Sequence, residues 1–218
     1  PDVFGGKNGY RAPDVYKYKG KYYMFVTFSD KPKMRRGTSI LVSKSPEGPF
    51  VPLVNAPITP TDMEALDGSL YVDDDKQPCS ADGLILAQKL SKDLKTTIGK
   101  PVALFHGSEA MGLKKKGGNH ITDAPFIHVA ENGDMLMTWS TFGKFGYMIC
   151  VAKSESGNIL GPWKQIKGPL YKDNGGHAML FKDFDRNLRI SYHSPNSKTE
   201  KMIIKNVSDA DGTISSVK

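Results

Sequence analysis

Three polar residues stand where apolar runs begin, and their types suit acid–base chemistry. Asp67 precedes Gly-Ser-Leu-Tyr-Val, Asp123 precedes Ala-Pro-Phe-Ile, and His177 precedes Ala-Met-Leu-Phe. Proline biases the residue before it to an extended backbone, so the segment after Asp123 is predicted to start as a strand. A carboxyl group near a second carboxylate has a raised pKa and can serve as a general acid at neutral pH. An aspartate at such a place can also simply cap a turn.

The elements that would position these residues recur along the chain. Residues 12–58 match residues 124–170: an Ala-Pro step opens each copy, a hairpin signal such as Lys19-Gly20 follows, and a Gly-Pro-aromatic step comes before the tail. Further units begin near residues 66 and 175. Repeated units of short strands are typical of β-propeller blades, so we predict an all-β fold with four blades or parts of them.

The third of these units is predicted to lack a strand. A first strand is expected over residues 66–72 and a turn over 73–75, after which the chain leads directly to another strand at 83–88. Removing an inner strand would leave unpaired backbone groups on its neighbours. The sequence therefore predicts that residues are missing near Pro78-Cys79.

Composition restricts the class of protein and its partners. The 218 residues are 24% charged and 39% hydrophobic, as in ordinary globular domains. The net charge of +7 includes two basic runs, residues 31–36 and 114–116, which we interpret as solvated loops and not as a nucleic-acid site. No stretch is apolar enough to span a membrane. The two cysteines, Cys79 and Cys150, predict neither a disulfide framework nor a zinc site.

Five motifs in order resemble glycoside hydrolase family 43. They are APDVYKYKGKYYMF, LDGSLYVDDD, TDAPF, SESGNILGPW and GGHAMLF…YHSPN, and the likeness extends over residues 1–218. The resemblance implies a five-bladed β-propeller with an axial active site, here a single domain that lacks its first blade. It also implies an inverting hydrolase with three carboxylates, of which the general base would belong to that first blade. Many members have glutamate where this chain has Asp123.

The resemblance also implies roles for Asp123, Asp67 and His177, and the residue types of Arg189 and Trp139 add two candidates for binding substrate. Asp123 would be the general acid, and Asp67 the carboxylate that raises its pKa. His177 would lie near the axis, either beside a calcium or sodium ion through water or hydrogen-bonded without an ion. Arg189 would bind a sugar hydroxyl or an anionic group, unless it is a surface charge. Trp139 would stack on a sugar, unless it packs in the core.

The resemblance implies a glycosidase acting on arabinose- or xylose-containing plant polysaccharides or oligosaccharides. The alternative is a carbohydrate-binding propeller without catalysis. No cofactor is expected to be required, and neither nucleic acid nor a membrane is an expected partner. Residue 1 is not methionine and no signal peptide is visible, so we expect a mature or trimmed product, secreted or periplasmic in a bacterium.

Overall fold

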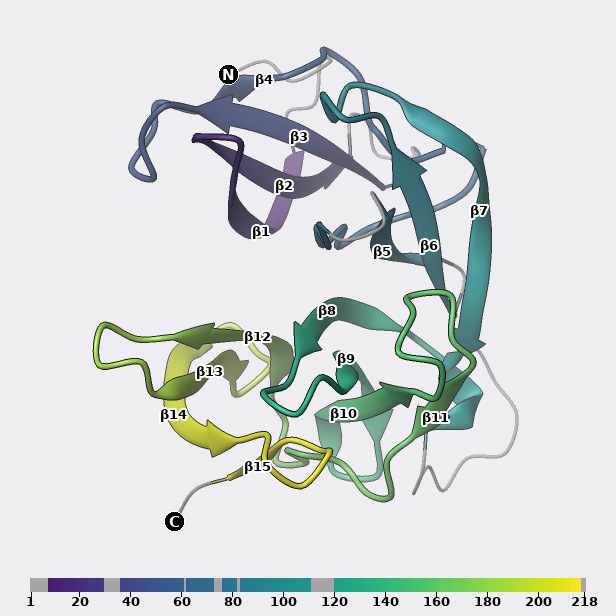
Figure 1. The fold of residues 1–218 in the computed structure, drawn as a ribbon, viewed down its shortest axis with the longest axis vertical. Helices are drawn as coiled ribbons and strands as arrows, with labels where there is room; N and C mark the ends of the chain where they lie inside the picture. The colour runs from purple at the N-terminus through teal and green to yellow at the C-terminus, as the bar shows by residue number, and fades with distance from the viewer. Residues whose placement is uncertain are drawn as a thin grey trace. The chain divides into compact units, whose positions relative to one another are not determined.

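A computed structural model describes residues 8–29, 36–60, 62–72, 76–81, 83–110 and 120–216. Apart from one short 3-10 turn, η1 (Gly107–Glu109), every regular element in these ranges is a β-strand (Figure 1). The strands form four sheets in which sequential neighbours pair. The predicted all-β class is confirmed. The basic runs at 31–35 and 114–116 and the turn at 73–75 lie outside the described residues.

Three of the sheets have four strands that follow one another in chain order. The first contains β1 (Asn8–Tyr18), β2 (Lys21–Ser29), β3 (Gly37–Ser43) and β4 (Val51–Pro52). The next contains β8 (Asp123–Val129), β9 (Met135–Gly143), β10 (Gly146–Ser154) and β11 (Trp163–Gln165). The last contains β12 (Gly176–Lys182), β13 (Leu188–Ser194), β14 (Lys201–Ser208) and β15 (Ser215–Ser216).

The remaining sheet corrects the prediction for the third unit. It contains β5 (Lys76–Ala81), β6 (Leu84–Leu90) and β7 (Thr97–His106). A strand therefore runs through Pro78-Cys79, so the predicted absence of a strand there is wrong, and the prediction of missing residues stays a prediction. Residues 67–72, predicted as a strand, have no regular structure. Residues 76–81 supply the strand that was predicted to be absent. Their sequence contains a proline and no apolar alternation, so the pattern does not indicate a strand.

The chain divides into two compact units. The first comprises residues 1–82 and 86–102, and the second comprises 83–85 and 103–218. The first unit contains the sheet β1–β4, and the second contains the sheets β8–β11 and β12–β15.

The first strands of the four-stranded sheets share a β-bulge near their start. The bulges lie between Arg11 and Asp14, between Asp123 and Phe126, and between Gly176 and Met179. One residue inside each bulge has a left-handed backbone, with φ of 44° at Ala12, 48° at Ala124 and 57° at His177. The bulges confirm the internal repeat, and they place Pro13 and Pro125 at equivalent positions.

Each unit has its own apolar core. In the second unit, residues of β9, β10, β12 and β13, such as Leu136, Ile149, Leu180 and Ile190, form one buried cluster between the two sheets. In the first unit, Phe25 is in a cluster formed by β2, β3 and the segment around residues 90–94. The central strands β9 and β10 are buried along most of their length, as expected for strands with both faces covered.

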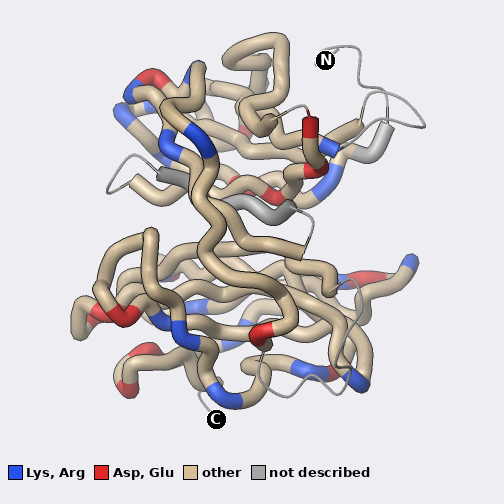
Figure 2. The backbone as a smooth tube through the Cα atoms, turned by 90° about the vertical axis from the view of Figure 1, so that its right-hand side faces the viewer, with Lys and Arg blue, Asp and Glu red and all other residues tan. Residues whose placement is uncertain are grey.

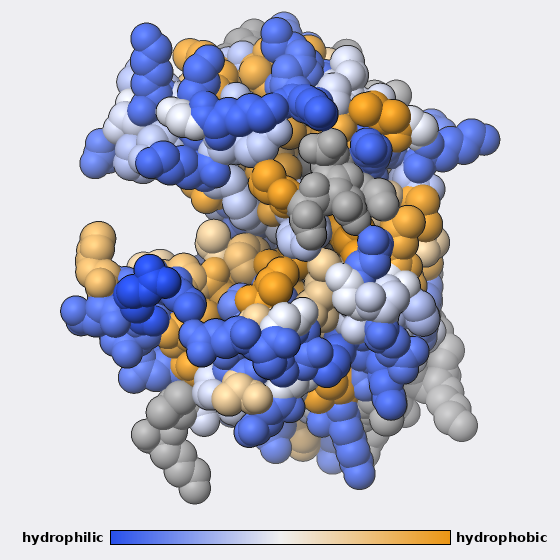
Figure 3. All heavy atoms as spheres, viewed as in Figure 1, coloured by the Kyte–Doolittle hydropathy of each residue, from blue (hydrophilic) through white to orange (hydrophobic). Residues whose placement is uncertain are grey.

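The exposed surface is mostly polar, with charges of both signs. Hydrophilic residues dominate the face seen in Figure 3. Segments of Lys and Arg and segments of Asp and Glu both occur along the tube in Figure 2, separated by other residues. Within the described ranges, no helix has the length and apolar character needed to cross a membrane.

Candidate active site

Asp123 begins β8 and lies opposite Ser140 of β9. Its side chain is half-buried. The hydroxyl of Tyr147, near the start of β10, donates a hydrogen bond to Asp123 Oδ2 over 2.9 Å. The predicted strand entrance is present, and the bulge that follows it turns the chain away from regular pairing just after the carboxylate. Such an arrangement places the carboxyl group at the end of the sheet.

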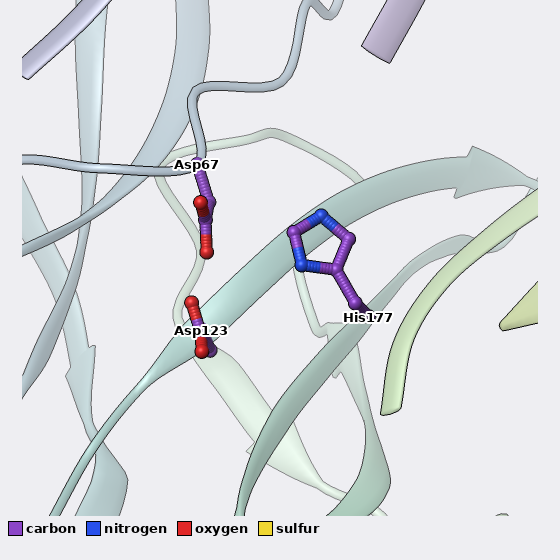
Figure 4. A group of neighbouring side chains, drawn as sticks. All are labelled: Asp67, Asp123 and His177. Carbon is purple, nitrogen blue, oxygen red and sulfur yellow. The ribbon is translucent and has the colours of Figure 1, made fainter. Parts of the chain in front are cut away.

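His177, the second residue of β12, lies close to this carboxylate. A ring nitrogen of His177 and a carboxylate oxygen of Asp123 lie within 4.8 Å of each other. Figure 4 shows these two side chains extending from β12 and β8. The backbone N–H of His177 donates to Ser140 Oγ over 2.9 Å, which ties the start of β12 to β9. The structure thus brings together two of the residues that the sequence predicted for the site.

Tyr147 is held from several directions at this end of the second unit. Its backbone N–H donates to Asn174 Oδ1 over 3.3 Å, and its carbonyl accepts from Gly175 N over 2.9 Å. Its ring stacks on the His193 ring, with 5.6 Å between centroids and 18° between planes. A Cβ on Gly176 would collide with the Tyr147 ring, so the absence of a side chain at Gly176 allows the close approach.

Asp67, labelled in Figure 4, belongs to the first unit and has its hydrogen-bond partners there. It is 8% exposed and has a left-handed backbone with φ of 52°. The Thr27 hydroxyl donates to Asp67 Oδ1 over 3.2 Å, and the Asp67 N–H donates to Thr27 Oγ1 over 2.8 Å. The neighbouring Gly68 N–H donates to Thr38 Oγ1 over 3.2 Å. These bonds fix the orientation of a buried carboxylate, which is costly to bury without such partners.

The contact of Asp67 with Thr27 repeats the contact of His177 with Ser140. In the register of their sheets, Thr27 lies opposite Arg11 and Ser140 lies opposite Asp123. In both cases a residue with a left-handed backbone donates its N–H to the hydroxyl at this position. Asp67 and His177 therefore hold equivalent positions relative to these hydroxyl groups. Asp123 is one residue before the corresponding position in its own repeat, which is Ala124.

A further polar cluster surrounds Tyr16 in the first unit. The Tyr16 hydroxyl lies 2.8 Å from Ser69 Oγ and donates to Asp14 Oδ2 over 3.2 Å. Burial, followed by the charge of Asp14, raises the pKa of the Tyr16 phenol well above its usual value. The phenol therefore remains protonated and acts as a hydrogen-bond donor, and Asp14 has a structural partner next to the repeated Ala-Pro step.

The side chains of two predicted substrate-binding residues have other partners in the second unit. Trp139 is fully buried: its indole N–H donates to Gln165 Oε1 over 3.0 Å and its ring packs against Phe105 at 5.2 Å. It therefore has the core-packing role, not a face open to a sugar. Arg189 lies near the other end of β13 from His193, and its Nε forms a 2.7 Å ion pair with Asp183. The structure does not bring Arg189 to Asp123.

The sequence analysis did not assign the residues that support the carboxylate. Ser140, Asn174 and His193 come from three separate segments and have no pattern that distinguishes them from ordinary polar residues. For Tyr147 the sequence offers one indication: the residue directly follows Gly146, which closes the β9–β10 hairpin. Aromatic residues in strands most often pack in the core, so that signal alone could not indicate the contact with Asp123.

The donor atoms at this end of the second unit fit a hard cation only partly. Calcium takes six to eight oxygen ligands, whereas His177 offers a nitrogen. Asp123 offers carboxylate oxygens, but Tyr147 already donates to one of them. An ion here would need water molecules for most of its ligands, and His177 would then contact it through water.

Comparisons with known proteins agree with the fold. A family model described as glycosyl hydrolases family 43 matches residues 3–214. The crystal structure of an endo-arabinase from Bacteroides thetaiotaomicron VPI-5482 is 48% identical, with a TM-score of 0.88, and the match covers 94% of this chain and 78% of that one. No curated protein matches the chain.

More distant structures show the same fold. An endo-1,4-beta-xylanase from the same organism is 22% identical, with a TM-score of 0.78, and the match covers 98% of this chain and 77% of that one. A β-xylosidase/α-arabinofuranosidase from a compost microbial metagenome, solved with xylotriose in a calcium-free form, is 19% identical, with a TM-score of 0.73; the match covers 99% and 76%. The predicted β-propeller class is confirmed.

Proposed function

Because the chain belongs to glycosyl hydrolases family 43, we propose that it hydrolyses glycosidic bonds in arabinose- or xylose-containing polysaccharides or oligosaccharides. The observation that carries this proposal is the Asp123 carboxyl group, fixed by Tyr147 and placed beside His177 at the start of β8. The 48% identity to an endo-arabinase favours arabinose-containing chains as the first substrates to test.

Asp123 is the general acid of the proposed reaction. Its carboxyl proton passes to the glycosidic oxygen as the bond from that oxygen to the anomeric carbon breaks. In an inverting reaction a base removes a proton from water, which attacks the anomeric carbon from the opposite face. We carry over to Asp67 the role implied by the family resemblance, which is to raise the pKa of the acid by like-charge repulsion. The proposed reaction needs a carboxyl group that stays protonated near neutral pH.

His177 is proposed to bind substrate or a structural cation through water. The calcium-free form described for the compost enzyme indicates that calcium is relevant to some structures of this fold. A calcium or sodium ion would add positive charge near Asp123, and no cofactor is proposed for the bond cleavage itself. Treatment with EDTA should then lower the melting temperature, and adding calcium back should restore it. If EDTA leaves the melting temperature unchanged, a calcium ion is not part of the folded protein.

The proposal is tested by assaying the full-length protein on aryl α-L-arabinofuranosides, aryl β-xylosides, arabinan and xylan. Hydrolysis of at least one of them is expected, and proton NMR of the first product should show the anomer opposite to that of the substrate. Retention of configuration would contradict the inverting mechanism. Binding to these polysaccharides without turnover would favour the carbohydrate-binding alternative. We further propose secretion or export to the periplasm, which fractionation of the source cells would check.

A further inference from the structure

We propose that Tyr147 is the positioning residue for the Asp123 carboxyl group; this inference rests on the proposed glycosidase function. The phenolic hydroxyl donates to Asp123 Oδ2 over 2.9 Å, a distance typical of a strong hydrogen bond. A protonated carboxyl group accepts through one oxygen and donates through the other. The bond from Tyr147 makes Oδ2 the accepting oxygen of the protonated group and so fixes the orientation of the carboxyl plane.

The position of the Tyr147 hydroxyl is determined by contacts that do not involve Asp123. The backbone of Tyr147 bonds to Asn174 and Gly175, and the ring packs against Phe142, at 4.9 Å, and His193, at 5.6 Å. The residue is 2% exposed. A donor fixed before the substrate arrives loses little conformational freedom on forming the catalytic geometry.

Gly176 adds independent evidence that this geometry is required locally. A Cβ at this position would collide with the Tyr147 ring and would lie 3.0 Å from Ser140 Oγ. The same Ser140 hydroxyl accepts the N–H of His177. The start of β12 is thus shaped around the Tyr147 ring on one side and carries His177 on the other. One set of contacts therefore fixes both the carboxyl group and the histidine.

A buried tyrosine could also serve only to fill space, and its hydroxyl distinguishes the two roles. Phenylalanine fills the same volume but cannot donate to Asp123. A donor to a carboxylate favours the ionised form, so losing it should raise the pKa of the Asp123 carboxyl. If Asp123 is the acid, the basic limb of the pH–kcat profile should move to higher pH in Tyr147→Phe. A space-filling role would leave that limb where it is.

The experiment compares wild type, Tyr147→Phe and Tyr171→Phe. Tyr171 is the matched control because its hydroxyl lies 3.1 Å from Ser194 Oγ and its ring packs on Tyr192, in the same unit. For Tyr147→Phe we expect kcat on a poor leaving group to fall about tenfold, as for the loss of one hydrogen bond to a catalytic group. Activated aryl glycosides should lose less. Tyr171→Phe should keep the wild-type pH profile.

A direct titration makes the test independent of activity. The carboxyl carbon of Asp123, assigned by comparison with Asp123→Asn, is followed by NMR as a function of pH. Its midpoint should be higher in Tyr147→Phe than in wild type and unchanged in Tyr171→Phe. An unchanged midpoint in a folded Tyr147→Phe protein would overturn the positioning role, whatever the activity. A shifted midpoint in a protein without glycosidase activity would support the contact and count against the proposed function.

Discussion

Asp123 combines a sequence signal with a geometry that the signal did not contain. The Ala-Pro step after it predicts a strand entrance, and the structure adds a bulge, a phenolic donor and a neighbouring imidazole. Aspartate is one methylene shorter than the glutamate that many family members have. The tyrosine hydroxyl on its Oδ2 indicates how the shorter side chain is kept in one orientation.

Asp123→Ala should lower turnover most for substrates with poor leaving groups, because these depend on protonation of the leaving oxygen. General acid catalysis contributes about 10²–10⁴-fold, which sets the size of the expected loss. Activated aryl glycosides should be affected much less. Steady-state kinetics on a series of leaving groups measures the difference, with Asp185→Ala, an exposed carboxylate on the β12–β13 turn, as the control. Equal losses on good and poor leaving groups would show that Asp123 is not the acid.

Cys150 should be unreactive in the native protein. It is buried in β10, and burial raises the pKa of its thiol to about 12, so almost no thiolate is present at neutral pH. The thiolate is the nucleophile, and alkylation should therefore require unfolding. Peptide mass mapping after iodoacetamide treatment, with and without urea, measures this residue separately from Cys79. Rapid alkylation of Cys150 in the folded protein would contradict its burial.

At the scale of the elements, the bulged first strands decide which side chains reach the ends of the sheets. Each bulge places one residue with a left-handed backbone at the strand start, and alanine or histidine adopts this conformation in the second unit. Non-glycine residues in this region carry strain of about 1–3 kcal/mol, which the surrounding hydrogen bonds must offset. The N–H of His177, bonded to Ser140, is one such bond.

Gly176→Ala should destabilise the protein by roughly 1–3 kcal/mol, the range for overpacking, because the added methyl group meets the Tyr147 ring. Gly143→Ala is the matched control. Its methyl group would lie 2.6 Å from Met148 Sδ, and a flexible methionine end can move aside. Urea unfolding measures both variants. If the two substitutions cost the same, the Tyr147 ring does not restrict Gly176.

At the scale of the whole molecule, the prediction of a single domain over residues 1–218 stays a prediction. The chain divides into two compact units, and β6 and β7 contribute to both. Each unit has its own buried cluster. A strand shared between units favours cooperative unfolding, because unfolding one unit removes partners from the other.

Ile149→Ala tests this cooperativity. Ile149 is fully buried in the cluster between β8–β11 and β12–β15, so its truncation should cost about 2–5 kcal/mol. If the chain is one domain, calorimetry should show a single transition that moves to lower temperature. Hydrogen exchange should then quicken in peptides of both units. Two transitions, of which only one moves, would show that the units unfold separately.

The sequence by itself determined the all-β class, the internal repeat and the strand entrances that carry Asp123 and His177, whereas the strand predicted after Asp67 is absent. These follow from local chemistry: proline and glycine place turns, and alternation of apolar residues defines strands. Local signals were misleading over residues 67–81, because β5 is stabilised by pairing with β6 and not by its own composition.

Only the tertiary structure decided the roles of the side chains around these entrances. Trp139 is a core residue because β9 is covered on both faces, and Arg189 pairs with Asp183 because the register of β12 and β13 puts it far from His193. Tyr147 meets Asp123 across two strand pairings, and Asp123 and His177 occupy successive positions of equivalent bulges. Such contacts depend on register and on packing between strands distant in the chain, and no residue pattern within one strand specifies them.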